Sequence, residues 1–214
     1  SSTNGSELYE VYRQGGTEVT GSAVTGAGIS LNLSSIAEGR FVSGAARGAI
    51  APSGSVFAAN LIDTTLGDGL LIAATPSTEA IHSGVYRFQG FVAGQQNQSN
   101  NLLHFDNARL EFTSAANAIF DRSGFNVIHS VDSGAVNGPA NAFMGDPEIN
   151  VSVGAIDSEG FFTLNSSTTE LKMTGFASAD KEQLFFSIRY TETGTGGNDK
   201  KYIGLAIATL DERE

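Results

Sequence analysis

The sequence predicts an all-β fold, an antiparallel meander barrel or barrel-like sandwich of roughly nine to twelve strands with an internal duplication. Three observations predict it. Apolar and polar residues alternate with a period of two almost everywhere, as they do in half-buried strands. Turn-forming residues recur at about the 8–12-residue spacing of a sandwich or barrel. The composition, with 26 Gly and only 16% charged residues, suits short strands joined by tight turns.

Six segments carry the alternation, at 84–93, 103–112, 149–156, 170–177, 183–190 and 201–209. In 84–93, Tyr86, Phe88 and Val92 fall on one face, which we expect to point into the core. The phase slips within 103–112, which predicts a bulge or turn at Asp106 and Asn107. Residues 114–121 are the one stretch that suits a short helical turn.

An internal repeat relates residues 29–75 to residues 149–209. Gly39 and Phe41 fall opposite Gly160 and Phe162 when one residue is inserted, and 48–53 fall opposite 175–180. Val56-Phe57 then aligns with Leu184-Phe185, and 70–75 align with 204–209. A single meander leaves two strand edges and an apolar face uncovered. We therefore expect one domain over 1–214, with intervening strands over 84–131 and a long loop over 131–146.

A family resemblance rests on the runs GVYRFQGF (84–91), AIDSEGFFTL (155–164), MTGFASADKEQLFF (173–186) and KKYIGLAIAT (200–209). They resemble the repeated lipocalin-like β-barrel modules of bacterial secreted proteins and lipoproteins of unknown function. The resemblance implies the barrel fold and an exported location. It carries no catalytic residue to this chain.

Composition and charge limit the classes of partner that the protein is expected to bind and the compartment in which it is expected. The net charge of −11 disfavours nucleic-acid backbones and anionic lipid headgroups. The chain has no cysteine, so disulfides and thiolate-bound zinc are excluded. No apolar run is long enough for a transmembrane helix. Ser1–Ser6 resembles the polar tether after a lipidated cysteine, so we expect an extracytoplasmic protein, secreted, periplasmic or anchored as an outer-surface lipoprotein through a removed N-terminal cysteine.

Few residues suggest a catalytic or a metal-binding site. His82, His104 and His129 lack the spacing of a zinc motif, so we predict no metal site on them and no catalytic residue. The acidic loops at Asp63, Asp68, Asp146 and Glu148 leave calcium open as a cofactor, although no calcium-loop motif is present. The sequence therefore favours a protein that is not an enzyme.

Fourteen Phe residues and no Trp indicate a Phe-rich core. The adjacent pairs Phe161-Phe162 and Phe185-Phe186 must each put one ring on the core face and one on the opposite face. This predicts an interior that binds a small apolar ligand through Phe88, Phe105, Phe185 and Ile188, or a surface partner bound near loop residues 137–144. The alternatives are a structural module of a larger cell-envelope protein, and a hydrolase or isomerase with its site in the barrel mouth.

Overall fold

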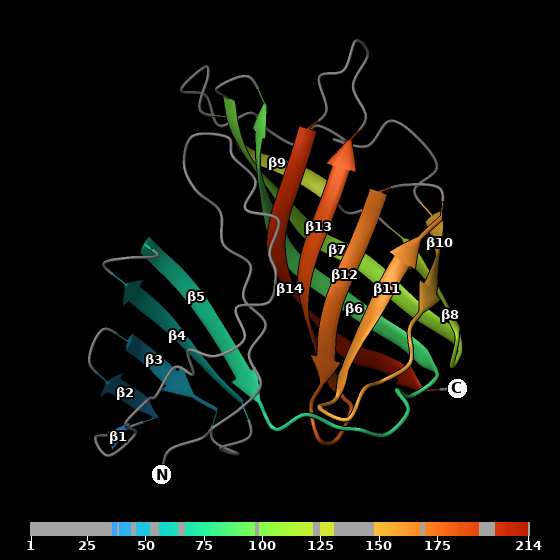
Figure 1. The fold of residues 1–214 in the computed structure, drawn as a ribbon, viewed down its shortest axis with the longest axis horizontal. Helices are drawn as coiled ribbons and strands as arrows, with labels where there is room; N and C mark the ends of the chain where they lie inside the picture. The colour runs from blue at the N-terminus through green and yellow to red at the C-terminus, as the bar shows by residue number, and fades with distance from the viewer. Residues whose placement is uncertain are drawn as a thin grey trace. The chain divides into compact units, whose positions relative to one another are not determined.

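The computed structural model describes part of the chain in detail, namely residues 36–37, 39–43, 46–51, 56–63, 67–96, 99–121, 125–130, 148–167, 170–192 and 200–213. The predicted loop over 131–146 and its candidate patch at 137–144 lie outside these residues. The chain divides into two compact units, 1–75 and 76–214. Each unit has its own antiparallel sheet (Figure 1).

The first unit contains a five-stranded meander. Its strands follow the chain order: β1 (Ile36–Ala37), β2 (Arg40–Ser43), β3 (Ala46–Ile50), β4 (Val56–Asp63) and β5 (Gly67–Ala74). Phe41 and Ala59 are buried in this sheet, and the ring of Phe41 packs edge-on against that of Phe57 at a centroid distance of 5.9 Å. These contacts give the sheet an apolar face of its own.

The second unit is a closed barrel of eight antiparallel strands. Its strands are β6 (Gly84–Gln96), β7 (Ser99–Ser114), β8 (Asn117–Asp121), β10 (Glu148–Val153), β11 (Phe161–Ser166), β12 (Glu170–Ala177), β13 (Gln183–Glu192) and β14 (Lys200–Arg213). The order runs β6-β14-β13-β12-β11-β10-β8-β7, and pairing of β7 with β6 closes the ring. Figure 1 shows β11, β12 and β13 in front of β6 and β7.

A further strand, β9 (Phe125–Ser130), shares an edge of β7 with β8. β8 pairs with Arg109–Ser114 and β9 with Asn101–Phe105 of β7, so the sheet that contains the barrel has nine strands in all. The predicted all-β antiparallel barrel is confirmed. Strands β1–β5 lie in a sheet separate from the barrel, and the predicted union of both units in one domain stays a prediction.

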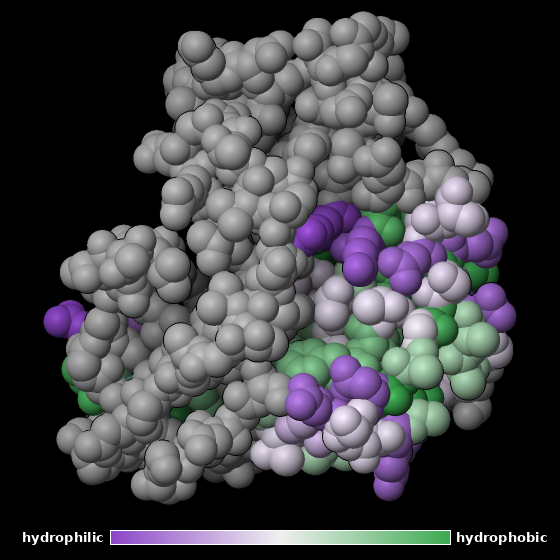
Figure 2. Space-filling model, viewed as in Figure 1, coloured by the Kyte–Doolittle hydropathy of each residue, from purple (hydrophilic) through white to green (hydrophobic). Residues whose placement is uncertain are grey.

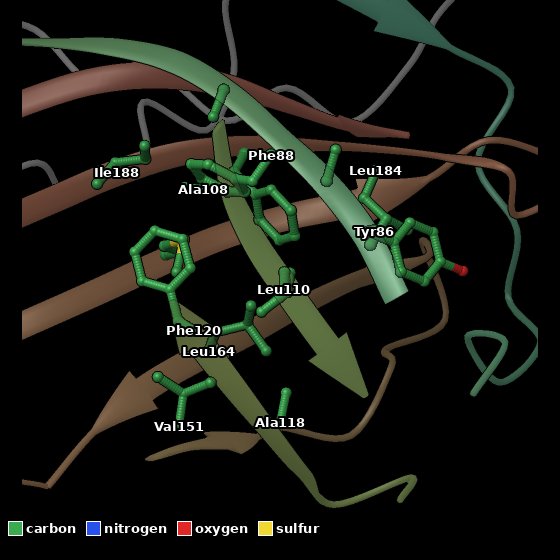
Figure 3. Close-up of a cluster of buried hydrophobic side chains, with 14 of the residues drawn as sticks. Tyr86, Phe88, Ala108, Leu110, Ala118, Phe120, Val151, Leu164, Leu184 and Ile188 are labelled. Carbon is green, nitrogen blue, oxygen red and sulfur yellow. The ribbon is translucent and has the colours of Figure 1, made fainter. Parts of the chain in front are cut away.

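The predicted alternation of inward-facing and outward-facing side chains determines which residues form the core. Every barrel strand turns alternate side chains inward, and the buried cluster includes Tyr86, Phe88, Leu110, Phe120, Val151, Phe162, Leu164, Met173, Leu184, Phe186, Ile188, Ala206 and Ala208 (Figure 3). The bulge predicted at Asp106 and Asn107 is confirmed. Phe88 pairs with Ala108 and Gly90 pairs with Phe105, so two residues of β7 oppose one residue of β6.

The short helical turn predicted over 114–121 is wrong. A tight turn at Ala115 and Ala116 leads directly into β8. Ala118 and Phe120 are each 1% exposed and point inward, so burial at a period of two outweighs the helix-forming tendency of the alanines.

The two meanders share a strand register. Phe41 pairs with Gly48, which pairs with Ala59; Phe162 pairs with Gly175, which pairs with Phe186. The hairpins that follow also match, because the N–H of Ala51 donates to Val56 and the N–H of Ser178 donates to Gln183, each over 2.8 Å. By this register Phe57 corresponds to Leu184, one residue away from the sequence alignment. The duplication itself stays a prediction, which the matching registers support.

Candidate functional site

The residues predicted to line an interior ligand site occupy different environments. Phe88 and Ile188 have no exposed surface and belong to the packed core. Phe185 alternates with the inward-facing Leu184 and Phe186, so it lies on the outer face of β13. Phe105 pairs with Gly90 through the backbone, and its side chain lies outside the described residues. The assignment of these four residues as ligand contacts stays a prediction.

Aromatic rings from several strands pack together in the described part of the barrel interior. The ring of Phe88 packs against Phe120 at a centroid distance of 4.8 Å and against Phe186 at 5.9 Å. Phe162 packs edge-on against Phe186 at 5.6 Å, and Tyr86 packs against Phe112 at 5.5 Å. Such spacings correspond to direct ring contact, here between strands that are adjacent or next but one around the barrel.

Rings also line up on the outside of the barrel, as the Phe-Phe pairs predicted. Phe161, Phe176, Phe185 and Ile207 are successive cross-strand partners on β11, β12, β13 and β14, and we call them the outer row. Phe161 and Phe176 meet edge-on at 5.7 Å, whereas Phe176 and Phe185 stack at 5.2 Å. Figure 2 views this face and shows hydrophobic side chains in the middle of its visible part, between hydrophilic ones.

Within the outer row Phe185 is only 4% exposed and Phe161 and Phe176 are half-buried, and apolar surface becomes exposed only toward β14 and β6. Ile207 is 38% exposed, and Phe91, which pairs with Leu205, is 42% exposed. Large apolar side chains on adjacent strands are the kind of surface that contacts another macromolecule. This face therefore offers the barrel an apolar exterior wall.

One end of the barrel carries an apolar pocket of about 260 Å³, which we call the end pocket. Its walls come from the segment before β6, from the end of β7 and from the connection after β10. Phe112, 2% exposed, forms its floor, and Ile81, Val153 and Ile156 pack against the core beside it. No local sequence pattern marks this site, because its walls come from segments far apart in the chain, each too short to show a pattern.

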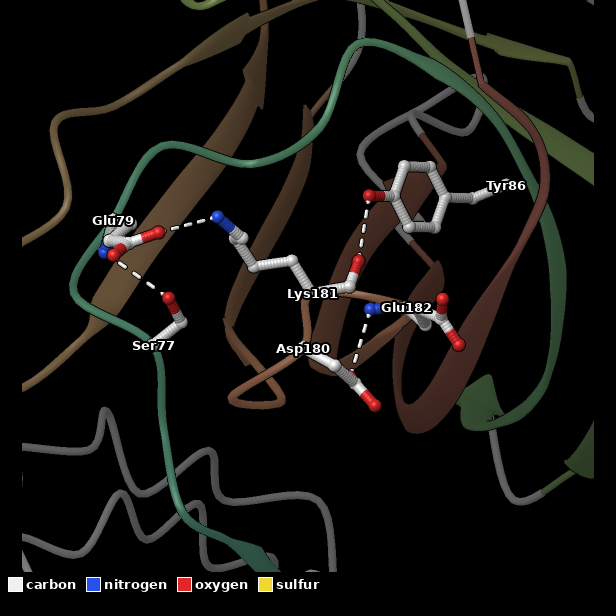
Figure 4. A network of polar contacts seen from close by, with 6 residues as sticks. All are labelled: Ser77, Glu79, Tyr86, Asp180, Lys181 and Glu182. Carbon is white, nitrogen blue, oxygen red and sulfur yellow. Dashed lines mark hydrogen bonds and ion pairs between the residues drawn. The ribbon is translucent and has the colours of Figure 1, made fainter.

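A polar cluster fixes the segment before β6 to the β12–β13 hairpin (Figure 4). The Nζ atom of Lys181 lies 2.6 Å from Oε2 of Glu79, and the Tyr86 hydroxyl donates to the Lys181 carbonyl over 2.9 Å. The N–H of Ser77 donates to the Ala177 carbonyl over 2.9 Å. Lys181 has a φ of 60°, a left-handed turn conformation that the hairpin imposes. These bonds hold the wall of the end pocket in place.

The Ser178 side chain completes the same hairpin. Ser178 is 4% exposed, and its hydroxyl lies 2.5 Å from Oδ1 of Asp180, while the N–H of Gln183 donates to Ser178 Oγ over 3.1 Å. The N–H of Glu182 donates to the Asp180 carboxylate over 3.1 Å. A buried hydroxyl with both its donor and acceptor capacity used is a structural group, so we assign this hairpin to positioning.

Glu79 gives a prediction for the pH dependence of stability. The hydrogen bond from the Lys181 ammonium, together with its charge, lowers the pKa of the Glu79 carboxyl below its usual value. A lowered folded-state pKa adds stability above the unfolded pKa, and that stability is lost as the pH falls through the folded pKa. We expect Glu79→Gln to lower the Tm at pH 7 and to match the wild type at pH 3.

Thermal unfolding of both proteins at pH 7, 5 and 3 measures this difference. Glu159→Gln is the control, because Glu159 is exposed and forms no ion pair within the described part of the chain. A Tm difference between Glu79→Gln and wild type that is as large at pH 3 as at pH 7 would show that the ion pair does not stabilise the fold.

The metal and histidine predictions fall mostly outside the described side chains. His82 is half-buried in the segment before β6, whereas the side chains of His104 and His129 lie outside the described residues. Asp146 also lies outside them, as do the side chains of Asp63 and Asp68; Glu148 is exposed at the start of β10. Among the described residues, no group of three His, Cys, Asp or Glu side chains is placed to hold a metal ion.

Comparisons with known proteins find only limited structural similarity. No protein family and no curated protein matches the chain. Among solved structures it is similar to Transferrin Binding Protein B, a vaccine antigen from Haemophilus parasuis Hp5, in a single-mutant form (TM-score 0.44) and a double-mutant form (TM-score 0.43). Each match has 12% sequence identity and covers 86% of this chain but only 40% of the solved chain. No helix among the described residues is long and apolar enough to cross a membrane.

Proposed function

We propose that this chain is an exported, non-enzymatic barrel module that binds a partner through its exterior and holds no ligand inside. The filled interior carries this proposal. All eight barrel strands contribute to one buried cluster, in which Tyr86, Phe88, Leu110, Leu164 and Ile188 have no exposed surface. A barrel that holds a ligand needs an enclosed space. In the described part of the interior, around Phe88 and Phe186, packed side chains occupy that space.

The exterior supplies the alternative binding surfaces. The outer row continues into Phe91 on β6, and the end pocket exposes apolar walls beside the segment before β6. Export is supported by the acidic, cysteine-free composition and by the resemblance to secreted barrel modules. The alternative, a hydrolase or isomerase in the barrel mouth, would depend on His104 or His129, whose side chains lie outside the described residues.

Titration with palmitate tests the proposal. Its sixteen-carbon chain needs a long apolar cavity such as a ligand-binding barrel provides, and it exceeds the end pocket. Isothermal titration of the protein, refolded after removal of bound lipid, is expected to show no saturable one-to-one binding. One-to-one binding that the exterior substitutions Phe91→Ser and, in the end pocket, Ala155→Leu both leave unchanged would contradict the proposal, because neither exterior surface would then hold the ligand.

A further inference from the structure

The end pocket has the chemistry of a site for one apolar side chain. Its wall is made by Ile81, Val153 and Ile156 over the ring of Phe112, and no charged residue lines it. Ala80, Ala115 and Ala155 are exposed at its rim, where their small side chains leave the mouth open. An apolar group that enters it becomes an extension of the core, because the walls already pack against the core cluster.

The size of the pocket limits the ligand. A volume of about 260 Å³ lies below the roughly 300–1,000 Å³ of small-molecule sites. A cavity of roughly 150 Å³ already holds a benzene-sized molecule. The pocket therefore fits a single branched aliphatic or aromatic side chain, and a larger molecule must present that group from outside.

Backbone groups beside the pocket are available to a peptide. The N–H groups of Gly154 and Asp157 donate to Thr163 and Phe161, over 2.7 and 2.9 Å. Between them, the N–H groups of Ala155 and Ile156 have no hydrogen-bond partner within the described part of the chain. The same holds for Ala80 and Ile81 on the other side of the pocket. An extended peptide can use such main-chain groups, whereas a free hydrocarbon cannot.

The charges around the rim favour a basic peptide. Glu79 adjoins the lining residues Thr78 and Ala80 and is balanced by Lys181, with the half-buried His82 nearby. Asp157 follows the lining residue Ile156, and Glu159 is exposed in the same connection. The segments next to the lining residues thus carry three carboxylates and the paired ammonium of Lys181, in a chain of net charge −11. One oxygen of Asp157 also accepts the N–H groups of Glu159 and Phe161. A Lys or Arg next to the apolar anchor would complement this charge.

We propose that the end pocket binds an extended segment of a partner protein that presents one aliphatic or aromatic side chain followed by a basic residue. The apolar side chain fills the pocket over Phe112, and the peptide backbone bonds to one of the two bordering segments, 80–81 or 155–156. This inference rests on the proposed exterior binding and specifies the partner for one part of that exterior.

Blocked dipeptides test the proposal by ¹H–¹⁵N NMR titration of the whole chain. N-acetyl-Leu-Lys-amide is expected to give saturable shifts at Ile81, Phe112, Ala155 and Ile156. Its affinity should exceed that of N-acetyl-Ala-Lys-amide at least about tenfold, since burial of the larger leucine side chain is lost in the alanine peptide. It should also exceed that of N-acetyl-Leu-Glu-amide, by a ratio that falls as salt is added.

Variants at the rim locate the binding. Ala155→Leu, and separately Ala115→Leu on another part of the rim, should fill the mouth and abolish the shifts; both sites are exposed, so the fold is expected to persist. Ala58→Leu, at an exposed site on β4, is the matched control and should change nothing.

Three results would overturn the proposal: no saturable shifts, binding unchanged in both rim variants, or toluene binding as tightly as the leucine peptide. If one of these three results is obtained and the protein also does not bind palmitate, the peptide proposal is wrong but the proposed exterior binding is not contradicted. One-to-one palmitate uptake inside the barrel removes that function itself, so the two failures are distinguishable.

Discussion

Gly204→Val is expected to destabilise the barrel by about 3 kcal/mol or more, the upper end of what overpacking a core costs. Gly204 is buried on β14, where it pairs with Ile188 on one side and Val92 on the other. A Cβ atom at this position would overlap the carbonyl oxygen of Phe91 and lie 2.6 Å from Cα of Val92. Backbone cannot move aside as the end of a flexible side chain can, so β14 and β6 would have to separate.

Urea unfolding followed by circular dichroism measures this loss. Thr209→Val on the same strand is the control, because Thr209 is exposed and a surface change typically costs about 0.5 kcal/mol or less. Gly204→Ala provides a milder second variant that places only the offending Cβ. A Gly204→Val protein with the unfolding free energy of the wild type would show that β6 and β14 do not approach this closely.

Phe88→Ala is expected to lower the unfolding free energy by about 3–5 kcal/mol, as for other phenylalanines removed from packed cores. Phe88 has no exposed surface, and its ring contacts those of Phe120 and Phe186. The substitution leaves a cavity where rings from three strands meet. Its cost therefore reports how completely the interior is filled.

Phe91→Ala is the matched control, on the same strand but the opposite face. Phe91 is 42% exposed, so its truncation should cost about 1 kcal/mol or less. Chemical unfolding of both variants gives the comparison. Equal losses for the two variants, or a small loss for Phe88→Ala, would mean that the ring of Phe88 borders open space inside the barrel.

Much of the fold follows from the sequence because its signals are local. Alternation in 84–93 places Tyr86 and Phe88 inside and Arg87 outside, as observed. A phase slip of apolar residues locates the bulge at Asp106 and Asn107, because an extra residue in a strand reverses the faces after it. The Phe161-Phe162 and Phe185-Phe186 pairs predict rings on both faces for the same reason, and their outer members belong to the outer row.

Features that depend on tertiary structure have no local signal in the sequence, so they could not be predicted from it. The segment 114–121 has helix-forming alanines, and only burial of Ala118 and Phe120 makes it a strand. The end pocket brings Ile81 together with Val153 and Ile156, which no local pattern relates.

The most direct test of the packed interior is a comparison of the protein's mass in the folded and the denatured state. Protein isolated from its own host is measured by mass spectrometry under native and under denaturing conditions. The two masses are expected to agree, because side chains pack closely around Phe88 and Phe186 in the described part of the interior. A stoichiometric apolar compound that is present in the native measurement and released on denaturation would contradict the filled barrel and the exterior binding proposed from it.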